Sequence, residues 1–62
     1  MNINTADLEE LTRLKGIGPA TAESIIAERE LNGPYYYPED LLAIKGIGAK
    51  TLQKFADKLQ FD

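Results

Sequence analysis

The sequence contains no cysteine and no histidine among its 62 residues. The absence of cysteine excludes disulfides and thiolate chemistry, and a zinc site is not expected without cysteine or histidine. Histidine is also the commonest general base, so the usual nucleophile–base pairs lack that partner. The carboxylates are spread over helix surfaces and form no oxygen-rich loop of the calcium-binding kind. We therefore predict no catalytic residue, no metal site and no enzyme activity.

Long apolar runs are also absent, so no segment is expected to span a membrane, and no signal peptide is visible. Any membrane attachment would have to come from a segment outside residues 1–62. A chain of this length forms one small domain, residues 1–62, which buries only about 60% of its unfolded surface and has a marginal core. The sequence alone leaves the cellular compartment open.

The charge is mildly negative, with a formal net value of −3. Taken alone, that value argues against a polyanionic partner. The distribution of the charged residues along the chain weakens this argument. Residues 1–32 carry six acidic and three basic side chains, whereas residues 33–62 carry four of each. The positive charge is therefore local, because only Asp57 is acidic among the four lysines at 45, 50, 54 and 58.

An internal repeat organises the chain. Residues 11–25 read LTRLKGIGPATAESI and residues 41–55 read LLAIKGIGAKTLQKF, which match at an offset of 30. Repeats of this kind mark one structural unit used twice. Each copy places spaced apolar residues before a Gly-Ile-Gly turn, and no strand-like alternation occurs. The pattern predicts an all-α fold made of two helical hairpins.

Helix signals flank both turns. The first helix is expected to begin near Thr5 or Ala6, capped by Asn4 or Thr5, and to end at Gly16. A second helix should begin at Gly18-Pro19 and stop at the LNGP sequence of residues 31–34. A third should begin at Pro38 and end at Gly46, and a fourth should run from about Ala49 to Leu59. The first hairpin thus covers about 5–31, the connector 32–37 and the second hairpin about 38–60.

The two Gly-Ile-Gly turns are candidates for anion binding. The first glycine permits a backbone conformation that a Cβ disfavours, and the isoleucine can point inward and fix the turn. The second glycine leaves bare N–H groups where the next helix opens, which is favourable for a phosphate. The alternative is a plain tight turn, which a single copy would favour. Two copies in the same context favour phosphate binding.

These residues resemble a known family. The patterns LTRLKGIGPA and IKGIGAK resemble the helix-hairpin-helix motif, and NINTADLEELTRLKGIG followed by NGPYYYPEDLLAIKGIG resembles the tandem helix-hairpin-helix domain of the competence protein ComEA family. The resemblance extends from about Ile3 to Leu59. It implies two helix-hairpin-helix motifs packed as a compact pseudo-two-fold (HhH)2 domain, similar to SAM domains.

The resemblance implies sequence-independent binding of double-stranded DNA, with turn amides on phosphates, in DNA uptake for competence. An anchored or extracytoplasmic location follows for ComEA proper, and a cytoplasmic one otherwise. No cofactor or small-molecule substrate is implied, although the family leaves room for a monovalent cation at the hairpins. Ala20 stands where many members have lysine, and Pro19 removes one N–H. The contacts carried over are Lys15, Gly16, Ile17, Gly18, Thr21, Lys45, Gly46, Ile47, Gly48, Lys50, Thr51 and Lys54.

The lysines of the expected fourth helix can be read in two ways. Lys50, Lys54 and Lys58 recur every four residues opposite Leu52, Phe55 and Leu59, which is either a DNA-tracking stripe or an ordinary solvated face. We expect Lys50 to contact DNA, retain Lys54 as a candidate, and expect Lys58 only to be solvated.

Two other functions remain open. The same tandem fold serves as a protein-interaction module in an extrinsic subunit of photosystem II, although those relatives lose the glycine pattern. It also serves as an accessory DNA-binding domain of repair enzymes and helicases. The tyrosines at 35–37 could stack on bases, but aromatic residues more often supply core area. We expect Tyr35 to be buried and Tyr36 to be exposed.

Overall fold

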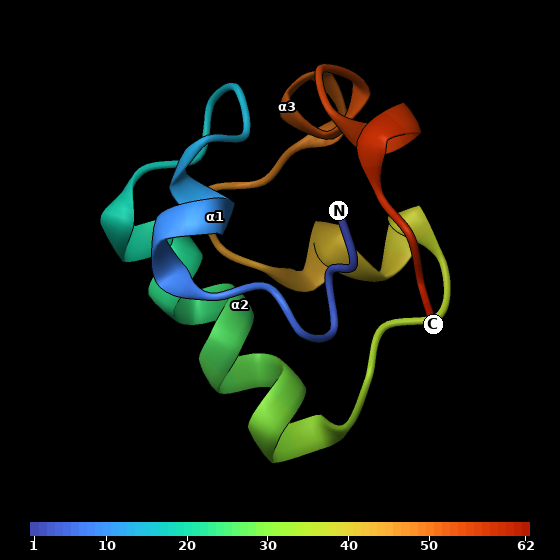
Figure 1. The fold of residues 1–62 in the computed structure, drawn as a ribbon. Helices are drawn as coiled ribbons and strands as arrows, with labels where there is room; N and C mark the ends of the chain where they lie inside the picture. The colour runs from blue at the N-terminus through green and yellow to red at the C-terminus, as the bar shows by residue number, and fades with distance from the viewer.

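Five helical segments follow one another in the computed structural model, which describes residues 1–62. They are α1 (Leu8–Thr12), α2 (Pro19–Asn32), the 3₁₀ helix η1 (Pro38–Ala43), α3 (Ala49–Gln53) and the 3₁₀ helix η2 (Ala56–Lys58). Helices α1 and α2 form one half of the molecule, and η1, α3 and η2 form the other (Figure 1). The predicted all-α class is confirmed. None of these helices has the length and apolar character needed to cross a membrane.

The first helix begins later and ends earlier than the sequence predicted. Asp7 caps it, because its Oδ1 accepts from the Glu10 amide at 2.8 Å while Glu10 Oε1 accepts from the Asp7 amide at 3.1 Å. Asn4 does not cap the helix. Its side chain exchanges two hydrogen bonds with the backbone of Tyr35, at 2.7 and 3.0 Å. The prediction of a start near Thr5 is therefore wrong, and Asn4 instead joins the N-terminal segment to the connector.

The second helix agrees with its predicted limits. Gly18 stands at its N-cap, Pro19 occupies its first position, and Gly33 ends it. Proline is favourable here because its missing N–H would have no partner inside the helix. The face formed by Ala22 and Ile25 is fully buried. This is the longest element, and it leads from the first turn to the opposite end of the molecule (Figure 1).

The second half departs from the prediction. Helix η1 begins at Pro38 as expected but is a 3₁₀ helix that ends at Ala43, well before Gly46. Its one buried residue is Leu41, and the chain becomes extended at Ile44, whose ψ is 127°. The expected long fourth helix is also wrong. It breaks at the fully buried Phe55, whose φ of −138° and ψ of 0° are not helical.

The break is followed by a contact between distant parts of the chain. Gln60 forms a parallel β-bridge with Asn2, in which Ile3 N donates to Gln60 O at 3.0 Å and Gln60 N donates to Met1 O at 2.7 Å. A straight helix from Ala49 to Leu59 would carry the chain away from this site. The pairing also covers Ile3, which is fully buried.

The core lies between the two halves and contains only apolar side chains and Tyr35. Tyr35 is 4% exposed, as predicted, and its hydroxyl donates to Ile25 O at 2.9 Å. Burial is the main cause that raises the pKa of Tyr35 to about 12. Tyr36 and Tyr37 are both exposed, so Tyr35 is the one tyrosine of the connector that lies in the core.

Candidate nucleic-acid interface

The two turns have the same local structure. Gly16 has a φ of +89° and Gly46 a φ of +97°, a region that side-chain-bearing residues rarely adopt. Ile17 N donates to Leu14 O at 3.1 Å, and Ile47 N donates to Ile44 O at 3.0 Å. The sequence repeat is therefore also a repeat of backbone conformation, and both turns lie toward the same end of the molecule (Figure 1).

The isoleucines hold the turns from inside. Ile17 is 5% exposed and Ile47 is 4% exposed, so both point into the core as the sequence predicted. Because their amides donate within the turns, neither residue offers a free N–H to a ligand. In each Gly-Ile-Gly turn, by contrast, both glycines are exposed and their amides form no hydrogen bond within the protein.

The first glycine of each turn packs against a threonine of the other hairpin. A Cβ on Gly16 would lie 3.2 Å from Thr51 Cγ2, and one on Gly46 would lie 2.8 Å from Thr21 Oγ1. These contacts place the half-buried Thr21 and Thr51 between the hairpins. Reciprocal contacts are what a pseudo-two-fold arrangement would produce, and that symmetry stays a prediction. The two threonines thus hold the turns side by side.

The second glycine of each turn has a different environment. Gly18 has φ −92° and ψ 177°, and Gly48 has φ −100° and ψ −179°, which any residue can adopt. A Cβ at either position would meet nothing within 4 Å. Neither glycine supplies a side-chain cap to the helix that follows. Neither the backbone nor the packing therefore requires glycine at these positions, and the space above both turns is open.

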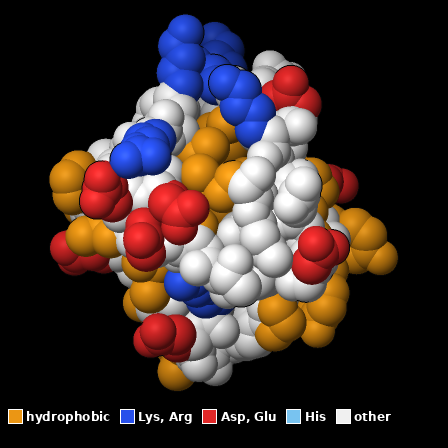
Figure 2. All heavy atoms as spheres, viewed as in Figure 1, with side chains coloured by type: hydrophobic (Ala, Val, Ile, Leu, Met, Phe, Trp, Pro, Cys, Tyr) orange, Lys and Arg blue, Asp and Glu red, His pale blue; other side chains and the backbone are white.

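Five exposed lysines accompany the turns. Lys15 and Lys45 directly precede the first glycines, and Lys50 lies in the first turn of α3. Figure 2 shows basic side chains gathered at the upper end of the molecule, where the two turns lie. The one salt bridge joins Arg13 to Glu9, so none of the lysines is paired with a carboxylate. Their charge is available to an external anion.

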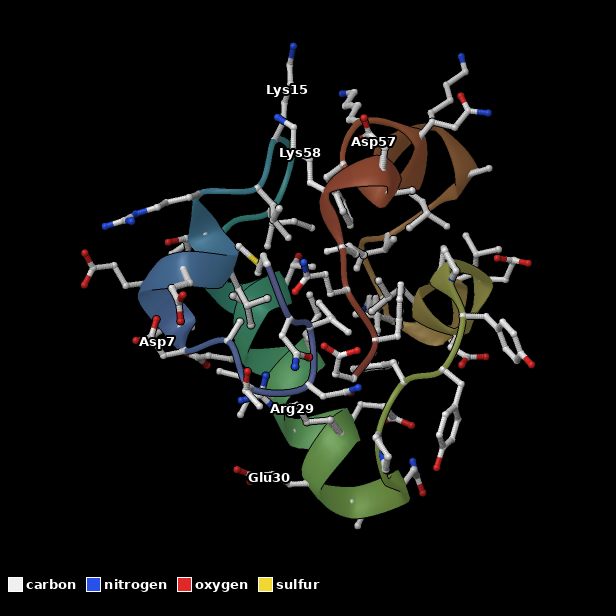
Figure 3. The ribbon with its side chains drawn as sticks, turned by 45° about the vertical axis from the view of Figure 1, so that its right-hand side comes forward. Asp7, Lys15, Arg29, Glu30, Asp57 and Lys58 are labelled. Carbon is white, nitrogen blue, oxygen red and sulfur yellow. The ribbon has the colours of Figure 1, made fainter.

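The break after α3 changes where the last lysines lie. The Lys54 stem reaches the first turn, since its Cδ would lie 4.0 Å from a Cβ on Gly16. Lys58 extends toward the same end of the molecule as Lys15 (Figure 3). The sequence reading left Lys58 out, because a straight helix would have carried it two turns away. No local sequence pattern predicts that the helix ends before Phe55. The break follows from the burial of Phe55 and from the pairing of Gln60 with Asn2.

Most of the acidic side chains on the face drawn in Figure 2 lie below this basic end. Asp7 and Glu30 point away from the end that carries Lys15 and Lys58, while Asp57 is the acidic residue nearest to that end in Figure 3. No group of three or more acidic, histidine or cysteine side chains could hold a metal ion. Basic side chains therefore gather at one end of the molecule, despite the net charge of −3.

Comparison with known proteins identifies the same unit. The family model described as the helix-hairpin-helix motif matches residues 1–60. The chain is 48% identical over 59 residues to ComE operon protein 1 of Bacillus subtilis, covering 95% of this chain and 29% of that protein. It is 44% identical over 62 residues to an uncharacterized protein of Haemophilus influenzae, covering 98% of this chain and 55% of that protein.

Other relatives are much longer proteins. A mouse protein called endonuclease/exonuclease/phosphatase family domain-containing protein 1 is 44% identical over 54 residues, which cover 87% of this chain and 10% of that protein. The chain thus spans only a part of each of these relatives, at most about half. The resemblance to the ComEA family drawn from the sequence is confirmed, and the chain belongs to the helix-hairpin-helix family.

Proposed function

We propose that this domain binds double-stranded DNA through the phosphate backbone, without sequence preference and without catalysis of its own. The two turns grip phosphates with glycine amides, and lysines around them supply positive charge. Membership of the helix-hairpin-helix family supports DNA binding in general. Our proposal goes further in three respects: the DNA is double-stranded, the contacts are made to its phosphates, and backbone amides of the turns make these contacts.

The observation that carries the proposal is the pair Gly18 and Gly48. Both have ordinary backbone angles, and a Cβ at either would meet no atom of the protein. A missing side chain that the fold does not need is best explained by a ligand that approaches the backbone closely. Exposed amides that have no hydrogen-bond partner in the protein favour an anion. The same exposed glycine in both turns suits a ligand with repeated anions, such as a phosphate backbone.

The lysines determine how binding should respond to salt. Lys15, Lys45 and Lys50 lie next to the turns, and neutralising about two to four phosphates gives a slope of log K against log[salt] near −2 to −4. Contacts to phosphates carry no direct sequence information. We expect dissociation constants of about 10⁻⁴ to 10⁻⁶ M, typical of non-specific binding.

The wider role that fits best is DNA uptake in competence. Its support is the similarity to ComE operon protein 1 and the resemblance of both turns to the competence proteins. Relatives of other names carry this domain within much longer chains. In this role the domain supplies the DNA contact, and the remainder of the longer protein supplies anchoring or assembly.

An amide NMR titration tests the proposal. The ¹⁵N-labelled domain is titrated at low salt with a short mixed-sequence duplex and then with a scrambled duplex of equal length. We expect the largest shifts at Gly18, Gly48 and Lys50, equal for both duplexes and reversed by salt. If these amides stay unchanged at millimolar DNA, the two turns are only compact corners and the proposal fails.

A further inference from the structure

A second candidate surface lies at the end of the molecule opposite the turns. A shallow pocket of about 150 Å³ opens between the last turn of α2 and η1, beneath the connector that joins them. In Figure 1 α2 ends at the bottom and the connector and η1 lie on the right, whereas the first turn lies at the top. The residues that line the pocket are Glu28, Asn32, Gly33, Pro34, Tyr35, Asp40 and Ala43.

Two carboxylates line the pocket, one from each helix. Asp40 Oδ2 accepts from the amides of Tyr36 and Tyr37, at 2.9 and 3.1 Å. Glu28 Oε1 accepts from the Asn32 side-chain amide. In both groups one oxygen is held by the fold while the other has no hydrogen-bond partner in the protein. No lysine or arginine forms a salt bridge with either group.

The lining of the pocket contains two carboxylates and no basic side chain. The nearest basic residue along the chain, Arg29, does not line the pocket, and its Nη1 donates to Ile3 O at 2.9 Å. Burial raises the pKa of Tyr35 to about 12, and the Glu28 charge adds to the rise while Arg29 opposes it. Burial is the larger cause of this rise, so the negative charge of the pocket rests on its two lining carboxylates.

Exposed apolar side chains are close in sequence to the residues that line this pocket. Leu31 is 81% exposed, Tyr36 65%, Tyr37 66% and Leu42 44%. They are four of the five large hydrophobic side chains that the molecule exposes, and each lies within two residues of a pocket-lining residue. Exposed apolar groups gathered around polar ones are typical of a surface that binds a partner.

We infer that this pocket binds an arginine side chain of a partner protein whose neighbouring residues are apolar. A guanidinium offers a planar fork of N–H donors for the free oxygens of Glu28 and Asp40, and it stacks on aromatic rings such as those of Tyr36 and Tyr37. The apolar neighbours would cover Leu31 and Leu42. A nucleic acid does not suit this acidic end, so the turns and the pocket would serve two different partners.

A peptide titration followed by amide NMR tests this inference. The probe is the blocked tripeptide acetyl-Leu-Arg-Leu-amide, and its matched control replaces arginine with citrulline, which has nearly the same shape without the charge. We expect saturable shifts at Gly33, Tyr36, Tyr37 and Asp40 with a dissociation constant in the low millimolar range, and no shift at Gly18 or Gly48. The citrulline peptide should bind at least about fivefold more weakly, as expected for loss of a charge-assisted pair.

Variants assign the effect to the pocket. Glu28→Gln should weaken binding at least about fivefold while keeping the hydrogen bond from Asn32, because the amide oxygen still accepts. Glu23→Gln removes the same charge from an exposed position of α2 outside the pocket and should change nothing. The absence of saturable shifts up to about 10 mM, an equal response to citrulline, or an unaltered affinity of Glu28→Gln would each overturn the inference. None of these outcomes depends on DNA binding.

Discussion

The two hairpins share a turn but not the helices around it. The first turn lies between the α-helix α1 and the fourteen-residue α2, whereas the second lies between the 3₁₀ helix η1 and the five-residue α3. Yet the first glycines differ by only 8° in φ, at +89° and +97°. The turn is therefore fixed by its own short pattern of buried residues and glycines, and the flanking helices vary without disturbing it.

The comparison also separates the roles of the two glycines in each turn. The first glycine of each turn has a positive φ and touches the threonine of the other hairpin, so it serves the fold. The second glycine has ordinary backbone angles and open space where a Cβ would lie, so the fold does not require it and we assign it to ligand binding at the surface. Substitutions at the two positions should therefore fail in different ways.

Replacement of the first glycines should have the largest effect. In Gly46→Ala the methyl group would lie 2.8 Å from Thr21 Oγ1 at a positive φ, whereas in Gly16→Ala the nearest atom is 3.2 Å away. We expect the free energy of unfolding to fall by about 2 kcal/mol for Gly46→Ala and by about 1 kcal/mol for Gly16→Ala. Thermal and urea unfolding measure the loss of stability in both variants. Gly48→Ser is the control and should keep full stability; an equal loss there would refute the division of roles.

Replacement of the second glycines should remove binding and spare the fold. In Gly48→Val and Gly18→Val a branched side chain would occupy the open space above the turn. We expect duplex affinity to fall at least about tenfold, which is about 1.4 kcal/mol, with helicity retained. Gly48→Val should cost more, since Pro19 already deprives the first turn of one N–H. Fluorescence anisotropy measures the duplex affinity and circular dichroism measures the helicity. Normal affinity in both variants would refute the close approach of a phosphate to these glycines.

Removing a lysine from the second hairpin, or adding one to the first, should change the duplex affinity by a smaller amount and in opposite directions. Ala20 and Lys50 occupy equivalent positions of the repeat. Lys50→Ala should lower affinity a few-fold and make the salt slope about 0.9 less steep, whereas Ala20→Lys should do the reverse. Both changes should be the same for duplexes of any sequence. An altered sequence preference in Lys50→Ala would instead identify Lys50 as a reader of bases.

The smallest effect is expected at Lys58, which has no basic counterpart in the first hairpin because the repeat places Glu28 there. Lys58→Ala should weaken duplex binding about twofold to threefold and reduce the salt slope by up to about 0.9. Arg13→Ala, which removes a charge already paired with Glu9, is the matched control and should be nearly neutral. Equal effects of the two variants would show that only the net charge matters at Lys58.

The sequence was sufficient to predict the repeated turns, because their pattern is local. Gly16 and Gly46 mark positive φ, Ile17 and Ile47 fill the core, and Gly18-Pro19 starts α2. The start of α1 was missed although a signal existed. Asp7 followed three residues later by Glu10 is a capping box, and it outweighs the weaker capping signals of Asn4 and Thr5.

The second half was harder to predict because its contacts are distant in sequence. Phe55 leaves the helical region in order to fill the core, and Gln60 pairs with Asn2 at the other end of the chain. Tertiary contacts of this kind override helix propensity. The position of Lys58 and the pocket between α2 and η1 both depend on such contacts, so neither could be read from local patterns.

The contacts of Gly16 with Thr51 and of Gly46 with Thr21 have a further consequence. They fix the distance between the two turns, because the backbone and the short threonine side chains that make these contacts have little freedom to move. If both turns hold phosphates, that separation selects duplexes by groove width, since A-form and B-form helices differ in this dimension. The domain would then distinguish DNA from double-stranded RNA by the spacing of its own two halves, without contacting a single base or 2′-hydroxyl.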